Sequence, residues 1–233
     1  MLHKIKELYG NSLAASDGCI GHVDDFYFDD QRWGIRYLIA DTGNWMPGRM
    51  VLLSPHAFGH LNQSERELQI NLTRQQIEDS PAIEAHIPVS RQYEMDYNTF
   101  YNWPLYWNGD LLWGVTGYPM GVSRTQEELD SYAQEHLNDD KHLQSTHAVH
   151  GYSVIATDGK VGHLSDFLVD GKSWRIEDLA IETGHWYSGK EILISTSNVT
   201  RISYEESKVF VNLAKSDIEQ TGRNQEVTAG LKP

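Results

Sequence analysis

The stretch DGCIGHVDDFYFDDQRWGIRYLIADTGNW, residues 17–45, recurs later in the chain as DGKVGHLSDFLVDGKSWRIEDLAIETGHW, residues 158–186. A shift of 141 residues aligns residues 10–79 with residues 151–220 without a gap. About a third of the aligned positions are identical. Chance does not produce such a match in one register over this length, so the chain contains two copies of one small unit.

Each copy has the pattern of short β-strands. The dipeptide Asp-Gly at residues 17–18 and 158–159 lies between apolar runs and favours tight hairpins. Residues 68–72 and 209–213 alternate between apolar and other side chains, as in a strand with one buried face. Thr73 and Gln76 have the spacing of a capping box, which predicts a short helix that Pro81 ends. Five or six short strands joined by such turns predict a small antiparallel barrel, a fold without exposed sheet edges.

We therefore expect a mainly β protein with two small antiparallel β-barrels and an aromatic-rich connector that contains one amphipathic helix. The first barrel, with its short C-terminal helix, is expected over residues 1–84 and the connector over residues 85–147. The second barrel follows over residues 148–222, and residues 223–233 are expected to be a tail. The connector helix is predicted near residues 125–137, where Thr125 and Glu128 form a capping box ahead of an apolar face.

Composition limits the class of protein. The chain has 233 residues, 39% of them hydrophobic, which is typical of globular domains. Its net charge of −14 argues against nucleic-acid partners and anionic membrane surfaces. No apolar run approaches the roughly 20 residues that span a bilayer, and the N-terminus lacks the pattern of a signal peptide. The single cysteine, Cys19, suits a reducing compartment, so we expect a cytoplasmic protein without a transmembrane segment.

Asp41-Thr42-Gly43 has the motif that aspartic proteases place at a catalytic carboxylate. Such a site needs two aspartates about 3 Å apart that share a proton. The second copy instead supplies Glu182, whose longer side chain would misplace its oxygens, and a large tryptophan follows each motif. Copies of about 70 residues are also too short for a protease lobe. We therefore reject the protease and interpret both segments as turns.

The order of these motifs resembles the PRC-barrel domain. The residues that carry the resemblance are the run Gly-X-hydrophobic-X-Asp-Phe at residues 21–26 and 162–167, the segments TGNW and TGHW, and GRMVLLSP at residues 48–55. The chain is most similar to bacterial proteins with two tandem PRC barrels around an aromatic connector. The domain also occurs in the photosynthetic reaction-centre H subunit and in a ribosome maturation factor, whose specific roles we do not carry over. The resemblance implies a docking or assembly module.

The connector is the second distinctive feature, with nine aromatic residues between Tyr93 and Tyr118. Such residues dominate interface hot spots, so one interpretation is a partner-binding surface. The other, which we favour, is a strap that packs across both barrels, because so much exposed aromatic surface would promote aggregation. The candidate interface residues are Tyr101, Trp103, Tyr106, Trp107 and Trp113. Residues 81–149 carry −7 of the net charge, which would suit a basic partner.

Histidines and aspartates give the remaining candidates. His56 with His60, and the three histidines of residues 142–150, lack further ligands at the spacing of a zinc site, so no metal is expected. His22 and Asp25 recur as His163 and Asp166 and are candidates for a site between the barrels. In a strand the two members of each pair should point to opposite faces, which weakens a catalytic pairing.

The sequence thus favours a non-enzymatic interaction or assembly module with no cofactor and an unidentified protein partner. A homodimer, formed through the connector, is one option. Two other functions stay open. One is a small-molecule-binding protein or enzyme with a site between the barrels. The other is an assembly factor that docks on a basic protein, such as a ribosomal one.

Overall fold

The computed structural model describes residues 1–47, 49–81, 91–107, 109–120, 143–184 and 189–230. The chain forms two compact units. Unit 1 comprises Met1, Glu7–Ser145 and Gly171–Arg175. Unit 2 comprises Leu2–Lys6, Thr146–Asp170 and Ile176–Pro233. Each unit therefore contains most of one repeat together with a short segment from elsewhere in the chain, and unit 1 also contains the connector up to Ser145.

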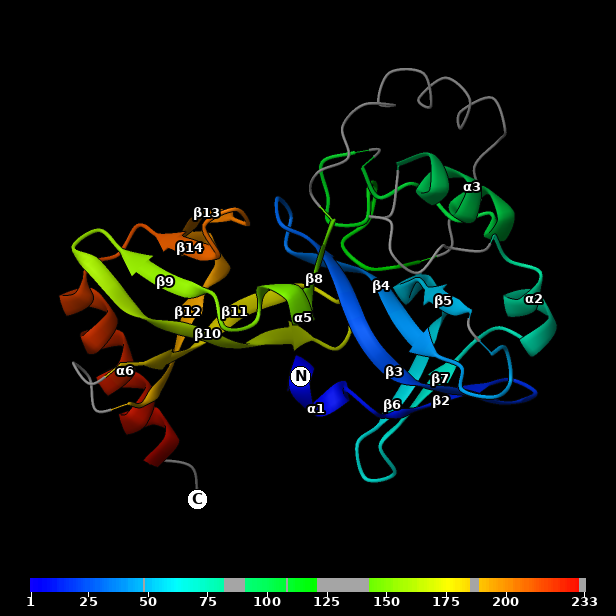
Figure 1. The fold of residues 1–233 in the computed structure, drawn as a ribbon, viewed down its shortest axis with the longest axis horizontal. Coiled ribbons are helices and arrows are strands. Elements are labelled where there is room, and N and C mark those ends of the chain that lie inside the picture. Colours follow the sequence, from blue (N-terminus) through cyan, green and yellow to red (C-terminus); the bar gives the residue numbers. More distant parts are fainter. Residues whose placement is uncertain (48, 82–90, 108, 121–142, 185–188, 231–233) are drawn as a thin grey trace. The chain divides into compact units, whose positions relative to one another are not determined.

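The sheet of unit 1 has seven strands (Figure 1). Six of them lie side by side in the order β5-β4-β3-β2-β7-β6, and β8 pairs with β3. Their bounds are β2 Ser12–Ala15, β3 Gly18–Asp29, β4 Gly34–Asp41, β5 Met50–Leu53, β6 Phe58–Asn62, β7 Glu67–Ile70 and β8 Leu143–Ser145.

The sheet of unit 2 repeats this arrangement strand for strand. Its order is β12-β11-β10-β9-β14-β13, and β1 pairs with β10. The bounds are β1 Leu2–Lys4, β9 Ser153–Ala156, β10 Gly159–Asp170, β11 Ile176–Thr183, β12 Glu191–Ser195, β13 Val199–Ser203 and β14 Lys208–Val211. The mainly β fold that the repeat predicts is confirmed, with one seven-stranded sheet in each unit.

The sheets differ from the predicted antiparallel barrels in two respects. First, β2 pairs with β7, and β9 with β14, in parallel. A parallel pair needs a long crossover connection, which hairpin signals in the sequence cannot reveal. Second, the described strands include no pair between β5 and β6, so the strand path stays open. The 3-10 helix η1 (Pro55–Ala57) joins these two strands and turns the chain there in place of a ladder.

The seventh strand of each sheet comes from the segment that precedes the other repeat. β8, which leads into the second repeat, pairs with β3 through Phe28 and Gln144. β1, which leads into the first repeat, pairs with β10 through Val169 and His3. Phe28 and Val169 are equivalent under the 141-residue repeat shift, and so are His3 and Gln144. Both leading strands therefore occupy the same place in their sheets.

A glycine holds neighbouring strands close together in both sheets. A Cβ atom on Gly21 would lie 2.0 Å from the carbonyl oxygen of Asp41, and one on Gly162 would lie 2.1 Å from that of Glu182. Each glycine is followed by a β-bulge, between Val23 and Asp25 in β3 and at the equivalent place in β10. The bulge changes which residues of the strand face inward.

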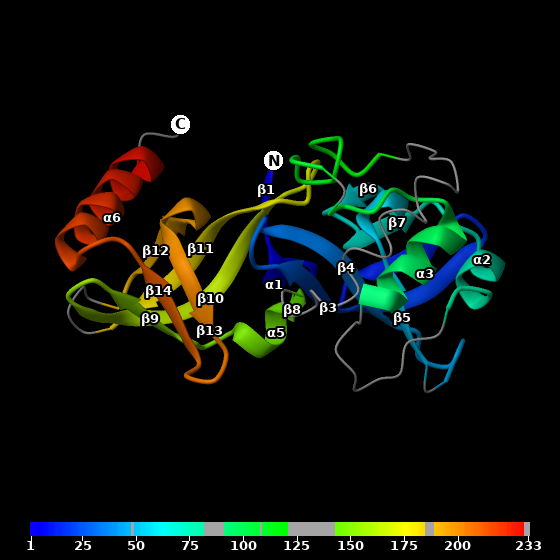
Figure 2. The same ribbon diagram turned by 90° about the horizontal axis from the view of Figure 1, so that it is seen from above.

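The helices are short apart from two. They are α1 Ile5–Leu8, α2 Arg74–Glu78, α3 Arg91–Tyr101, α5 Thr146–Val149, α6 Lys215–Gly230 and the 3-10 helix η3 Thr196–Asn198. The capping box of Thr73 and Gln76 is present, with both reciprocal hydrogen bonds. Pro81 follows soon after α2, whereas Gly222 stands at the equivalent place in the second repeat, so α6 continues into the predicted tail and contacts β12 (Figure 2).

Apolar side chains from both faces of the strands fill each unit. Unit 1 buries Leu13, Phe26, Phe28, Ile35, Leu38 and Leu53, and unit 2 buries Val154, Phe167, Val169, Ile176, Leu179, Ile192 and Val209. No helix in the described ranges is long and apolar enough to cross a bilayer. The amphipathic helix predicted near residues 125–137 lies outside the described residues.

We predict that Gly162→Ala destabilises the protein by about 2–3 kcal/mol, because overpacking forces backbone or side-chain shifts of that cost. Gly21→Ala should cost more, since Gly21 also has a φ of +125°, which side chains rarely adopt. The measurement is the free energy of urea unfolding. Gly117→Ala is the control, because a Cβ atom there has no neighbour within 4 Å. Equal stability of all three variants would contradict the close approach.

Candidate functional site

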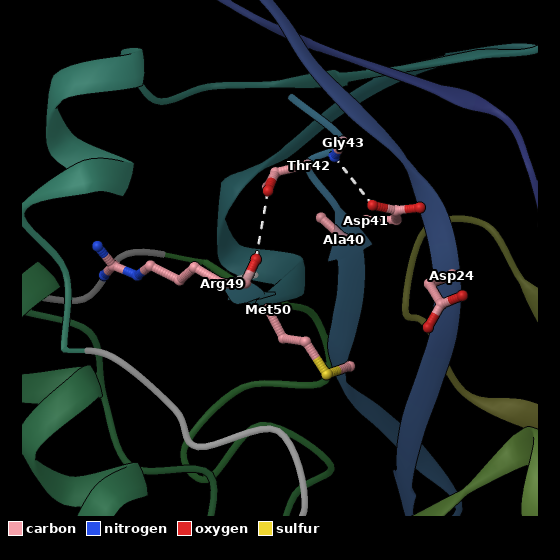
Figure 3. A pocket seen from close by; sticks show the side chains of 7 residues that line it. All are labelled: Asp24, Ala40, Asp41, Thr42, Gly43, Arg49 and Met50. Carbon is pink, nitrogen blue, oxygen red and sulfur yellow. Dashed lines mark hydrogen bonds between the residues drawn. The ribbon is translucent and has the colours of Figure 1, made fainter. Parts of the chain in front are cut away.

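A hollow of about 250 Å³ lies at the Asp-Thr-Gly turn of unit 1 (Figure 3). It is bounded by the end of β4, the start of β5 and the bulge of β3. Its lining residues are Asp24, Ala40, Asp41, Thr42, Gly43, Arg49 and Met50. It brings two exposed carboxylates next to a partly apolar floor.

The turn itself uses the polar atoms of the motif. The Thr42 hydroxyl donates to the carbonyl oxygens of Met46, at 3.0 Å, and Arg49, at 3.2 Å. The amide of Gly43 donates to Asp41 Oδ1 at 2.9 Å. In unit 2 the Thr183 hydroxyl donates in the same way to the carbonyl of Lys190, at 2.7 Å. These bonds account for the Thr-Gly pair in both repeats as a turn motif.

The guanidinium of Arg49 is directed away from the two carboxylates of the hollow (Figure 3). Its Nη1 donates to the carbonyl of Glu78 at 2.7 Å, and its Nη2 donates to that of Ser80 at 2.5 Å. Both carbonyls lie at the C-terminal end of α2, where a cation satisfies free acceptors and opposes the helix dipole. The charges that remain at the hollow, those of Asp24 and Asp41, are therefore negative.

The recurring His and Asp residues do not form pairs. His22 and His163 are exposed, whereas Asp25 and Asp166 are buried, in agreement with the alternation of side chains along a strand. His163 instead places Nδ1 3.0 Å from the carbonyl oxygen of Gly151.

The two aspartates hold the leading strands in place. Asp25 accepts from the amide of Phe26 at 2.7 Å and from the hydroxyl of Ser145 at the end of β8. Asp166 accepts from the amide of Lys6 at 3.2 Å, just after β1. Burial raises the pKa of the Asp166 carboxyl, although these backbone donors oppose the shift. The geometry gives Asp25 and Asp166 a structural use in each sheet.

The first part of the connector covers one face of the unit 1 sheet. Tyr97 on α3 is fully buried and packs with Tyr37, Ile39 and Leu52. Its hydroxyl donates to the carbonyl of Leu52 at 2.9 Å and accepts from the amide of Ser54 at 3.2 Å. These are outward-facing groups of the edge strand β5, so one hydroxyl satisfies a strand edge that would otherwise attract another chain.

The second part of the connector covers a buried ion pair that the sequence analysis missed. Arg36 donates to Asp29 Oδ2 at 2.9 Å, and the side chain of Arg36 is 0% exposed. Its guanidinium lies 3.9 Å from the ring centre of Tyr106 and 5.0 Å from that of Trp113. Burial alone would raise the pKa of Asp29, but the charge and hydrogen bond of Arg36 hold it below its usual value. The sequence signal for this buried ion pair was an arginine inside the otherwise apolar strand GIRYLIAD.

The predicted interface residues are all at least half-buried in unit 1. Tyr106 and Trp113 are buried, and Tyr101, Trp103 and Trp107 are half-buried. Trp113 also donates its indole N–H to the carbonyl of Ser173 at 2.8 Å. In the described part of the connector the exposed large apolar side chains are Phe100, Leu111, Val115, Tyr118 and Met120.

His56 lies among the connector aromatics. Its ring stacks on Trp103, with ring centres 5.5 Å apart, and meets Trp113 edge-on at 5.0 Å. Its Nδ1 lies 3.0 Å from the hydroxyl of Ser54. The described residues contain no group of three or more His, Cys, Asp or Glu that could hold a metal ion. Burial, assisted by the charge of Arg36, lowers the pKa of His56 to about 4.

We predict that His56 makes unit 1 less stable in mild acid. Between pH 6.5 and 4 the unfolded chain binds a proton at this histidine and the folded protein does not, so stability falls as the pH drops through this window. The full effect is about 3 kcal/mol. It should appear as a difference between wild type and His56→Gln in urea unfolding followed by tryptophan fluorescence. His60→Gln, at an exposed site, should keep the wild-type dependence. Parallel pH profiles of wild type and His56→Gln would contradict the prediction.

Comparison with known proteins agrees with the motifs. Residues 145–218, which hold nearly all of the second repeat, match the family model of the PRC-barrel domain. The comparison with curated proteins gives no match. The match covers β9 to β14 and the turns between them. Residues 145–218 are therefore a PRC-barrel domain.

Proposed function

We propose that this protein is a non-enzymatic interaction module of the cytoplasm, built from two PRC-type barrels, and that its connector binds a protein partner. The assignment of residues 10–79 as a second PRC barrel is supported by the equivalent strand order and the same close glycine contact in both repeats. The cytoplasmic location is supported by the single cysteine.

The observation that carries the proposal is the apolar surface of the connector. Five of the seven large apolar side chains that are exposed in the described residues belong to it. Four of these five lie within residues 111–120 and form the connector patch, which consists of Leu111, Val115, Tyr118 and Met120. Exposed apolar surface concentrated in this way is typical of a binding site.

The support beneath the connector patch is pre-organised. The backbone at Leu111 forms a bridge with Gly114, and the amide of Trp113 donates to the carbonyl of Thr116 at 2.9 Å. Arg32 holds the carbonyl of Leu111 at 3.1 Å. A segment fixed in this way loses little conformational entropy on binding, which favours affinity.

The charge near the connector patch favours a basic partner. Residues 92–123 contain no Lys or Arg, whereas Asp96 and Asp110 are exposed. Complementary charge speeds association and disfavours acidic partners. This is the observation in favour of an assembly factor that docks on a basic protein.

A non-enzymatic role is supported by the use of the polar groups at the Asp-Thr-Gly turn. Thr42, Gly43 and Arg49 are all engaged in local hydrogen bonds that build the turn or cap α2. The polar groups of this motif are therefore used to build the turn and to cap α2, which favours a structural role for the motif.

We predict that the double variant Tyr118→Ser, Met120→Ser loses the partner that the full-length protein captures from its native host. The loss of one hot-spot side chain costs about 2 kcal/mol or more, so binding should weaken at least about thirtyfold. The melting temperature should stay unchanged, because both side chains are exposed. Leu2→Ser removes exposed apolar surface outside the connector and is the matched control. Equal capture by all three proteins, measured by mass spectrometry, would rule out the connector patch.

A further inference from the structure

In unit 2 a lysine ammonium lies at the start of the edge strand β12. Lys4 Nζ, from β1, lies 2.5 Å from Glu191 Oε1. The other oxygen of Glu191 accepts from the hydroxyl of Ser165, at the bulge of β10, at 3.3 Å. The Lys4 ammonium is thus bound by Glu191, the first residue of β12, next to the bulge of β10.

In unit 1 the leading strand supplies no such ammonium. Ser145 stands where the repeat shift places Lys4, since Ser145 pairs with Tyr27 as Lys4 pairs with Leu168. The serine side chain is short, and its hydroxyl donates to Asp25 instead. The leading strand of unit 1 therefore leaves the region beyond β5 without a cation.

The hollow of Figure 3 is lined by Met50, the first residue of β5, and by Asp24 at the bulge of β3. Met50 stands at the position of Glu191, and Asp24 stands at the position of Ser165. Asp41 and Asp24 line the hollow, and Asp24 forms no hydrogen bond or ion pair with the described residues. Unit 2 therefore has its carboxylate on β12, whereas unit 1 has it on β3. The negative charge is kept in unit 1, and among the described residues of its leading strand no lysine takes the place of Lys4.

The shape and chemistry of the hollow fit a lysine side chain. Ala40 and Met50 provide an apolar surface for the alkyl chain, and the carboxylates of Asp24 and Asp41 provide acceptors for the ammonium. Arg49 is turned toward α2 and does not neutralise them. His22, which pairs with Asp41 in the sheet, is exposed and is the other titratable group beside them.

We propose that the hollow of unit 1 is a receptor for a lysine side chain of the protein partner, and that it uses the place that Lys4 occupies in unit 2. That the lysine comes from a protein partner rests on the proposed function. That the hollow prefers a primary ammonium rests only on the comparison of the two units. The basic partner favoured by the charge of the connector would supply such a side chain.

The direct test is a titration of the full-length, ¹⁵N-labelled protein with N-acetyl-lysine N-methylamide, followed by amide chemical shifts. We expect saturable shifts at Asp24, Asp41, Gly43 and Met50 with a dissociation constant on the order of tens of millimolar. An exposed ion pair contributes about 1 kcal/mol or less, and each buried methylene of the alkyl chain adds about 0.8 kcal/mol. The Nε-acetylated form of the same probe, which is neutral, should not produce them. Equal shifts with both probes would overturn the proposal.

Three variants test the same proposal, and one of them copies the lysine of unit 2. Ser145→Lys places a lysine where unit 2 has Lys4 and should abolish probe binding, because the hollow is then filled from within. Ser145→Gln has a similar length without the charge and also loses the bond to Asp25, so it should still bind the probe. Asp24→Asn should weaken binding about three- to fivefold. Unchanged binding in Ser145→Lys or Asp24→Asn would overturn the proposal.

A second arm separates this proposal from the proposed function. Capture of the partner by the full-length Asp24→Asn variant should fall, as the probe affinity does. If capture depends on the connector patch but not on Asp24, the lysine receptor is overturned while the interaction module stands. Tight binding of spermidine together with no binding of the lysine probe would also overturn it, because the ligand would then be a free polyamine.

Discussion

At Gly21 the backbone of β3 passes so close to the carbonyl of Asp41 that there is no room for a Cβ atom, and Gly162 repeats this contact with Glu182. The close pairing brings β3 against β4 at the point where β3 bulges. Asp25 lies just after the bulge on the buried face of β3, and its carboxylate accepts a hydrogen bond from Ser145 of the leading strand β8. The close strand pairing, the bulge, the buried acceptor and the seventh strand thus lie next to one another in the sheet.

The two repeats differ most where the connector lies. In unit 1 the outer face of the sheet presents Tyr37 and Ile39, which Tyr97 covers. The equivalent residues of the second repeat are Asp178 and Ala180, and burial raises the pKa of Asp178. An apolar face needs a cover, whereas a carboxylate on that face is more stable near water. The divergence of a few outward-facing residues therefore accounts for the cover that α3 provides on the face of the first repeat.

The same divergence separates structure from function in the connector. Its inner aromatics cover an arginine–aspartate pair, and breaking such a buried pair is costly, so these side chains are tied to stability. The side chains of the connector patch do not cover this ion pair, and they are exposed to solvent. The same unit also has a hollow with two carboxylates, which we propose takes up a lysine side chain. An apolar patch and an acidic hollow on one unit are complementary to a basic protein partner.

The sequence by itself determined the two repeats, the mainly β fold, the PRC-barrel domain, the capping box of Thr73 and the turn at Thr42. These features are encoded by neighbouring residues, through periodicity, turn chemistry and local hydrogen bonds. Only the tertiary structure decided the parallel pair of β2 with β7, the exchange of the leading strands and the burial of Trp113 over Arg36. A three-residue strand such as β8 has no periodic pattern. Its pairing depends on an acceptor more than a hundred residues away, which Asp25 provides once the chain has folded.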